Sequence, residues 1–181
     1  MKRWIAAPSK TLAGAVDTLA GDKSISHRFA MFSLLSDRVS TASGFLRAED
    51  TLRSLEIAKR LGAKVAWDND RLKIEPPSAI EEPSDYLDCG NAGTAMRIYA
   101  GLLAAQKGFF VLSGDKYLNS RPMKRVTKPL KAIGAAIDGR GECGFAPLAI
   151  RGNPLLASFE YESPVSSAQV KSAMILAGLN A

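Results

Sequence analysis

The chain has 181 residues, of which 46% are hydrophobic and 23% charged, and 24 basic against 18 acidic residues give a formal net charge of +6. This composition excludes intrinsic disorder and collagen-like structure, and no apolar stretch approaches the roughly 18 uninterrupted residues of a membrane helix. The apolar run at the N-terminus stops at Pro8, too early for a secretory signal, so we expect a cytoplasmic protein.

The first predicted elements are a helix near 24–35 and a strand in the alternating stretch 39–43. A second helix is expected over 51–61, with Asp50 as its N-cap and Gly62 as its stop signal. Its apolar face has helical spacing and comprises Leu52, Leu55, Ala58 and Leu61. On this interpretation, capping alone explains Asp50.

A hairpin completes this first group of elements. Its strands are predicted at 64–67 and 71–75, with 68–70 as the turn and 76–78 as a linker. Elsewhere the two cysteines stand far apart, without a Cys-x-x-Cys spacing, so we expect small buried side chains at both positions, Cys89 and Cys143.

An internal repeat with a period of about 70 residues organises the chain. Residues 21–35 align with residues 90–104, so that Arg28 falls on Arg97, and a third polar entry followed by an apolar helix begins near 166. Each unit is predicted as helix, strand, helix, strand, strand. The sequence therefore contains two units and the beginning of a third.

The helices that open the units are apolar nearly all round, as in 98–105 and 173–179, which predicts burial with only their ends in solvent. Equivalent helices in three repeats should run parallel, with their N-termini side by side on one face. Because a helix N-terminus carries free N–H groups and a partial positive charge, that face is predicted to bind an anion.

Polar residues stand at each of these N-termini. Lys23 and Ser24 open the first helix, and Arg28 projects from the same face one turn deeper. Gly93 lets an anion approach the backbone of the second helix without a Cβ in the way. The third helix offers neutral donors at Ser166, Ser167 and Gln169.

Structural explanations for these residues stay open. Capping alone would explain Ser24, Thr94 and Ser167. Arg28 and Arg97 could instead pair with carboxylates, and His27, without a metal partner or an evident nucleophile, is expected to be structural. The repeated placement of such residues at three helix starts is what favours a ligand site.

Arg121 is a further candidate, because Pro122 biases it toward an extended backbone that holds the guanidinium between a strand and a helix. A guanidinium suits carboxylate or phosphate bidentately. The surrounding segment 116–131 carries six basic residues and no acidic one, but a single aromatic and no recognised nucleic-acid motif. A solvated helix face is the simpler explanation for it.

Four motifs, in this order and spacing, resemble the EPSP synthase (3-phosphoshikimate 1-carboxyvinyltransferase) family: Gly21–Arg28, Gly90–Arg97, Arg121–Met123 and Ser167–Gln169. The resemblance spans the whole chain, which covers less than half of such an enzyme. It implies an α/β (α+β) fold of repeated βαβαββ units, the inside-out barrel of the enolpyruvyl transferases, here with two units and the start of a third.

The resemblance also implies a division into domains. Residues 1–20 would be strands of the other, C-terminal domain, and residues 21–181 an incomplete N-terminal domain that binds shikimate 3-phosphate. The units of this domain would be about 21–89, 90–157 and a truncated 158–181.

The family transfers the enolpyruvyl group of phosphoenolpyruvate to the 5-hydroxyl of shikimate 3-phosphate, on the route to chorismate and aromatic amino acids. The resemblance implies these two substrates as partners, no metal or other cofactor, no nucleic acid, no membrane, a monomer at full length and glyphosate as an inhibitor. Family residues that bind shikimate 3-phosphate resemble Lys23, Ser24, Arg28, Ser167, Ala168 and Gln169. Those that bind phosphoenolpyruvate resemble Lys23, Gly93, Arg121 and Gln169.

In this set Lys23 would serve catalysis through binding and electrostatics. The carboxylates proposed for acid and base work in the family lie beyond Ala181, so we expect this chain alone to bind substrate without turnover. Two alternatives stay open. The sister transferase acting on UDP-N-acetylglucosamine typically has Lys-Asn in place of Lys23-Ser24 and a catalytic cysteine, in some members aspartate, in a mobile loop. The corresponding region 113–123 has Asp115 but no cysteine. A non-enzymatic basic module would use 116–131 to bind nucleic acid.

Overall fold

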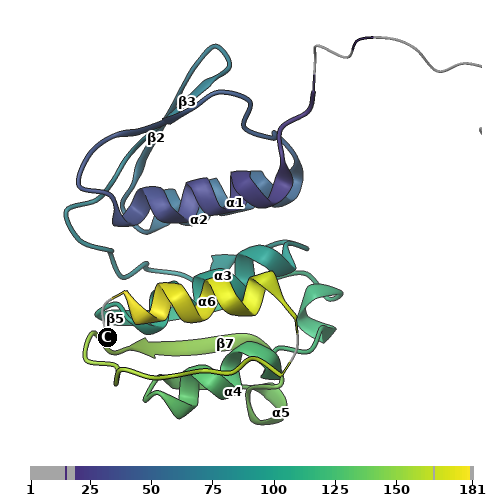
Figure 1. The fold of residues 1–181 in the computed structure, drawn as a ribbon, viewed down its shortest axis with the longest axis vertical. Helices are drawn as coiled ribbons and strands as arrows, with labels where there is room; N and C mark the ends of the chain where they lie inside the picture. Colours follow the sequence, from purple (N-terminus) through teal and green to yellow (C-terminus); the bar gives the residue numbers. More distant parts are fainter. Residues whose placement is uncertain (1–14, 16–18, 165, 180–181) are drawn as a thin grey trace, which may run out of the picture.

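The computed structural model describes Ala15, residues 19–164 and residues 166–179. Two sheets and their helices form stacked layers (Figure 1). The hairpin sheet is followed by α1 and α2, then by α3 and α6, then by the second sheet, and α4 lies on the far side. The strands predicted within 1–20 fall almost entirely outside the described residues.

The first unit has the predicted order of elements, and its hairpin lies where the sequence placed it. Its three strands form an antiparallel sheet in the order β1-β3-β2. The elements are α1 (Lys23–Phe32), the 3-10 turn η1 (Ser33–Leu35), β1 (Ser40–Ala42), α2 (Glu49–Arg60), β2 (Lys64–Asp68) and β3 (Arg71–Glu75).

The second unit repeats this order with an additional strand in front, which completes the βαβαββ pattern. Its sheet has the order β4-β5-β7-β6, with β4 and β5 parallel and the other pairs antiparallel. The elements are β4 (Leu87–Asp88), α3 (Gly93–Ala104), β5 (Gly108–Ser113), η2 (Leu118–Ser120), α4 (Lys124–Ala132), β6 (Ala136–Gly139), the short α5 (Arg140–Cys143) and β7 (Phe145–Gly152). The third unit contributes α6 (Ala168–Gly178).

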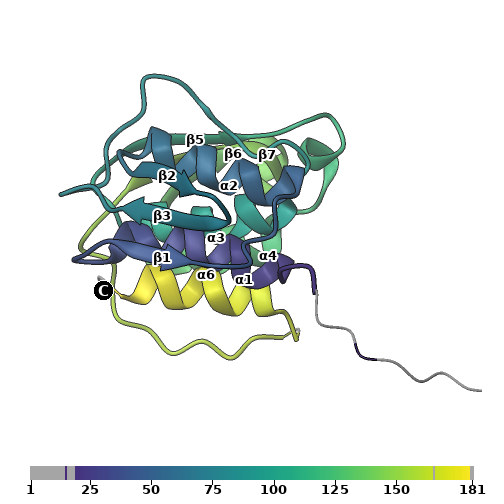
Figure 2. The same cartoon turned by 90° about the horizontal axis from the view of Figure 1, so that it is seen from above.

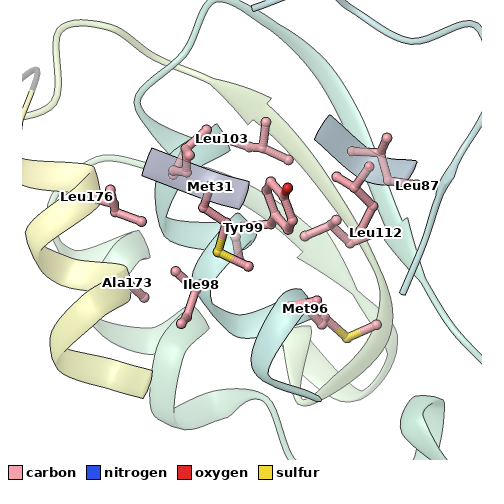
Figure 3. Close-up of a cluster of buried hydrophobic side chains, with 14 of the residues drawn as sticks. Met31, Leu87, Met96, Ile98, Tyr99, Leu103, Leu112, Ala173 and Leu176 are labelled. Atoms are coloured by element: carbon pink, nitrogen blue, oxygen red, sulfur yellow. The ribbon is translucent and has the colours of Figure 1, made fainter. Parts of the chain in front are cut away.

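Helix α3 is the centre of the hydrophobic core, and all of its residues except Thr94 are buried. Figure 3 shows Ile98 on the side of α3 that faces Ala173 and Leu176 of α6. The Tyr99 hydroxyl donates a 2.8 Å hydrogen bond to a carbonyl of α2, so the buried phenol is satisfied. The prediction of a buried helix is confirmed for α3.

The same prediction is wrong for α6, where the Ile175 side chain is 62% exposed. An apolar helix is buried all round only if neighbours cover every face. The second sheet covers α3, whereas α6 packs on α3 with one face, and no sheet of the described residues covers the other (Figure 1).

Helix α2 differs from the prediction in its cap and at one position of its apolar face, whereas Leu55, Ala58 and Leu61 are buried as predicted. Its N-cap is Ala48, and Asp50 lies inside the first turn. Leu52 is 39% exposed, whereas the polar Thr51 and Ser54 are buried. These hydroxyls can be buried because they are satisfied internally: Thr51 donates to the Leu46 carbonyl, and Ser54 Oγ lies 2.7 Å from His27 Nδ1.

The predictions for Gly62 and for the two cysteines are confirmed. Gly62 follows α2 with a φ of +99°, a left-handed conformation that favours glycine at a helix end. Cys89 and Cys143 are both buried. No helix in the described part of the chain is long and apolar enough to cross a membrane.

Candidate anion-binding site at the helix N-termini

Side-chain hydrogen bonds join the starts of α1, α3 and α6. Gln169 in the first turn of α6 donates from Nε2 to the Thr94 hydroxyl of α3 at 3.0 Å. Arg28 of α1 donates from Nη2 to Ser172 Oγ of α6 at 2.8 Å and to the Ala168 carbonyl at 3.4 Å. Figure 2 shows α1 and α6 side by side and starting at the same end. The three N-termini therefore lie together, as the repeat predicts.

Only one of the three candidate capping hydroxyls caps its helix. Ser167 caps α6 and accepts from the Val170 N–H at 3.4 Å. Helix α1 is capped by Asp22, which accepts from the Ile25 N–H at 2.7 Å. The N-cap of α3 is Ala92, which has no side chain able to cap. Capping is therefore the wrong explanation for Ser24 and Thr94, and the right one for Ser167.

Arg97 is a buried cation without a carboxylate partner among the described residues. Arg97 is 9% exposed. Its guanidinium donates to Gln169 Oε1 at 2.9 Å and, at longer distances, to the Gly93 and Pro122 carbonyls. Its Nε atom has no hydrogen-bond partner among the residues that the structure describes. Burial, followed by the charges of Arg125 and Arg121, lowers the pKa of the guanidinium. A buried, uncompensated cation of this kind favours a bound anion.

Arg28 also has no carboxylate partner in the described part of the chain. Its hydrogen bonds go to neutral acceptors, which are Ser172 Oγ and the Ser24 and Ala168 carbonyls. Carboxylate pairing is thus the wrong explanation for both Arg28 and Arg97. Their guanidinium charges are held in place by neutral groups and stay available to a ligand.

Arg121 and Gly93 complete the α3 side of the site. Arg121 has the predicted extended backbone, and its guanidinium bonds to the Asn91 side-chain and backbone oxygens. A Cβ added at Gly93 would lie 2.9 Å from Arg97 Nη1 and 3.3 Å from Arg121 Nη1. Both guanidinium groups therefore approach the α3 N-terminus so closely that a side chain at Gly93 would displace them.

Lys23 lies at the start of α1 and forms an ion pair with Asp50 of α2. The sequence interpretation of Asp50 as a helix cap is wrong, because its carboxylate faces α1 and fixes this ammonium. His27 is buried, its Nδ1 lies 2.7 Å from Ser54 Oγ, and burial, assisted by Lys23, lowers its pKa to about 4. A neutral, buried imidazole agrees with the structural role expected for His27.

The site thus gathers four cationic side chains around three helix starts: Lys23, Arg28, Arg97 and Arg121. The described residues contain no cluster of His, Cys, Asp and Glu that could hold a metal ion. Arg97, Asn91 and Asp50 were not predicted as site residues. The internal repeat indicates Arg97, because Arg97 aligns with Arg28. The contacts that Asn91 and Asp50 make depend on tertiary packing.

Comparison with known proteins identifies the family. Residues 6–181 match the family model described as EPSP synthase (3-phosphoshikimate 1-carboxyvinyltransferase). The chain belongs to the EPSP synthase family. The fold class expected from the motifs is confirmed with it.

Members of the EPSP synthase family from several bacteria are similar to this chain. A 3-phosphoshikimate 1-carboxyvinyltransferase of Nitratiruptor sp. is 62% identical over 166 residues, which are 92% of this chain and 38% of that protein. One from Campylobacter concisus is 56% identical over 170 residues, or 94% of this chain and 40% of that protein. The solved EPSP synthase of Acinetobacter baumannii superposes with a TM-score of 0.86 at 40% identity, covering 91% of this chain and 38% of that one. The chain spans about two fifths of the length of the relatives it matches.

Proposed function

We propose that this chain forms the shikimate 3-phosphate-binding part of an enzyme that transfers the enolpyruvyl group of phosphoenolpyruvate to the 5-hydroxyl of shikimate 3-phosphate. The observation that carries the proposal is the buried Arg97 guanidinium, which has no carboxylate partner among the described residues and lies where three helix N-termini meet. A multiply charged anion is the ligand that such a cluster favours.

Shikimate 3-phosphate would lie between the starts of α1 and α6. Its phosphate would be bound by Lys23, the Ser24 hydroxyl and Arg28, whose charge has only neutral partners in the described structure. At α6, Ser167, Ala168 and Gln169 offer donors to the same ligand. The Ser167 oxygen accepts from the helix, so its hydroxyl proton is still available for donation.

Phosphoenolpyruvate would lie against the start of α3. The absence of a Cβ at Gly93 leaves the backbone open to it, and Arg121 and Gln169 flank that opening. Arg97 adds a second guanidinium next to Gly93. Lys23 would contact both substrates, with Asp50 fixing its ammonium.

The described residues offer charge and position but no free acid and base pair at the site. The Asp50 carboxylate is engaged by Lys23, and the Asp115 carboxylate by the Leu118 N–H and Asn91. We therefore propose that residues 21–181 bind substrate without turnover, as the incomplete N-terminal domain of an enzyme that is monomeric at full length. Residues 1–20 would belong to its other domain.

The test is calorimetric titration of the 181-residue chain with shikimate 3-phosphate, and with shikimate as a control that lacks the phosphate. We expect binding of the phosphorylated compound and a loss of roughly 30-fold or more in affinity for the Arg28→Ala variant, because truncating one partner of a buried charge pair is strongly destabilising. Equal affinity for both compounds, or an unchanged affinity in Arg28→Ala, would contradict the proposal.

A further inference from the structure

Asn91 lies in the turn between β4 and α3 and connects two charged side chains of opposite sign. Its amide nitrogen donates a 2.7 Å hydrogen bond to Asp115 Oδ2. Its side-chain oxygen accepts from Arg121 Nη2, and its backbone oxygen accepts from Arg121 Nη1 at 3.4 Å. Both terminal nitrogens of the guanidinium are therefore held by this one residue.

The orientation of the Asn91 amide is determined by these charges. An ionised carboxylate only accepts hydrogen bonds, and a guanidinium only donates them. A flipped amide would place its oxygen against Asp115 and its NH2 group against Arg121, so that both contacts became repulsive. One orientation alone satisfies both neighbours, and each charge strengthens the bond on the opposite side of the amide.

Asp115 is itself fixed by the backbone. Its Oδ1 accepts from the Leu118 N–H at 2.7 Å, at the start of η2, and its own N–H donates to the Gly90 carbonyl at 2.8 Å. The hydrogen bonds from Leu118 and Asn91, with a smaller contribution from the charge of Arg121, lower the pKa of the carboxyl. Within the described ranges Asp115 forms no ion pair with Arg121, because the amide lies between them.

We propose that Asn91 is a positioning residue that uses the fixed Asp115 carboxylate to orient the Arg121 guanidinium toward the anion site without neutralising it. The inference rests on the proposed function, since it assigns the oriented guanidinium to phosphoenolpyruvate. A carboxylate in direct contact would orient Arg121 equally well but would compete with the anionic substrate. The neutral amide transmits the orientation and leaves the positive charge for the ligand.

The first test is the affinity for phosphoenolpyruvate of the 181-residue chain in the presence of shikimate 3-phosphate. We expect Asn91→Ala to weaken binding roughly 10- to 100-fold, the range for losing hydrogen bonds to a charged group. Asn119→Ala is the matched control, because the Asn119 amide bonds to Ser113 and Gly114 of the same loop and does not contact Arg121. An equal loss in both variants would mean that loop integrity, and not orientation, is responsible, and would overturn the inference.

A second variant separates charge from geometry. Asn91→Asp keeps the size and an acceptor for Arg121, but it neutralises the guanidinium and repels Asp115. We expect it to bind phosphoenolpyruvate more weakly than Asn91→Ala, although both variants lose the same amide donor. The reverse order would contradict the claim that the amide keeps Arg121 uncompensated.

The orientation itself is measured without a ligand by NMR of the Arg121 guanidinium. Held at both terminal nitrogens, it should show slow rotation about its Cζ–Nη bonds in the wild type and in Asn119→Ala, and fast rotation in Asn91→Ala. Fast rotation in the wild type, or slow rotation in Asn91→Ala, would overturn the inference. A wild-type chain that shows the slow rotation but binds no phosphoenolpyruvate would instead contradict the proposed function.

Discussion

At the scale of single residues, the site is defined by charges that the protein leaves uncompensated. Arg97 and Arg28 have only neutral partners among the described residues. Buried charges usually pair with an opposite charge, because desolvation costs several kcal/mol per ion. A protein that holds a guanidinium in this state retains a function at some expense of stability.

Replacing Arg97 should therefore separate stability from binding. In Arg97→Met the buried charge is removed and the volume is largely kept, so we expect the free energy of unfolding to stay within about 1 kcal/mol of the wild type or to rise. The variant should no longer bind shikimate 3-phosphate and phosphoenolpyruvate when both are present. Denaturant unfolding and calorimetry measure the two effects, and destabilisation by more than about 2 kcal/mol would show that Arg97 has a mainly structural role.

Gly93 gives a prediction about selectivity between the two substrates. The methyl group of Gly93→Ala would meet Arg97 Nη1 at 2.9 Å and Arg121 Nη1 at 3.3 Å, so both guanidinium groups must move. We expect weaker binding of phosphoenolpyruvate and of its mimic glyphosate, with the affinity for shikimate 3-phosphate changed less than about threefold. Calorimetry with the three ligands measures this, and an equal loss for all of them would contradict the assignment of Gly93 to the phosphoenolpyruvate side.

At the scale of elements, periodicity predicted helices and strands well and buried faces less well. The hairpin and the end of α2 at Gly62 follow from local signals in the sequence, and the parallel opening helices follow from the internal repeat. The apolar face of α2 is confirmed at Leu55, Ala58 and Leu61, but Leu52 is exposed, and Thr51 and Ser54 are buried with satisfied hydroxyls. Residue type alone does not show whether a polar group will find a partner inside the fold.

The same limit applies to the site residues. The family motifs predict individual site residues, and the structure brings the described ones together at the helix starts. The partners that orient them were missed, because Asp50 lies 27 positions from Lys23 and Asp115 lies 24 positions from Asn91. Contacts over such separations depend on the packing of α1 on α2 and on the approach of the segment after β5 to the turn before α3.

The contact between α1 and α2 predicts a dependence of stability on pH. The pKa of His27 is lowered to about 4 in the folded state, below its ordinary value of 6.5, so the unfolded chain binds more protons between these values. Stability contributed by the neutral imidazole is present above pH 6.5 and decreases as the pH falls to about 4, by an order of 3 kcal/mol in all. We expect His27→Gln to flatten this part of the profile, and an identical pH profile for the variant and the wild type in denaturant unfolding would contradict it.

At the scale of the whole molecule, the internal repeat explains both the architecture and the site. Each repeat contributes one sheet, and the starts of α1 and α6 lie at the same end of the molecule (Figure 2), where hydrogen bonds join α6 to α1 and α3. Composition alone shows a net charge of +6 but does not show where on the molecule the charge lies. The fold concentrates part of that charge where three helix dipoles already favour anions.

The described face contains no free acid and base pair, which gives a prediction about catalysis. With both substrates present, we expect the purified 181-residue chain to bind them without releasing phosphate above the rate of a protein-free control. A coupled assay for inorganic phosphate measures this. Steady release by the chain, lost in Arg28→Ala, would show that residues within it supply the missing acid and base.

The central claim is that the converging helix starts bind shikimate 3-phosphate, and thermal unfolding of the chain with and without this ligand tests it most directly. A ligand that binds only the folded state stabilises it by about 2.7 kcal/mol at a concentration one hundred times its dissociation constant. We predict an unfolding midpoint that rises with the concentration of shikimate 3-phosphate in the wild type, and that in Arg28→Ala rises only at concentrations roughly 30-fold higher. A wild-type midpoint that does not change at any concentration of the ligand would contradict the account.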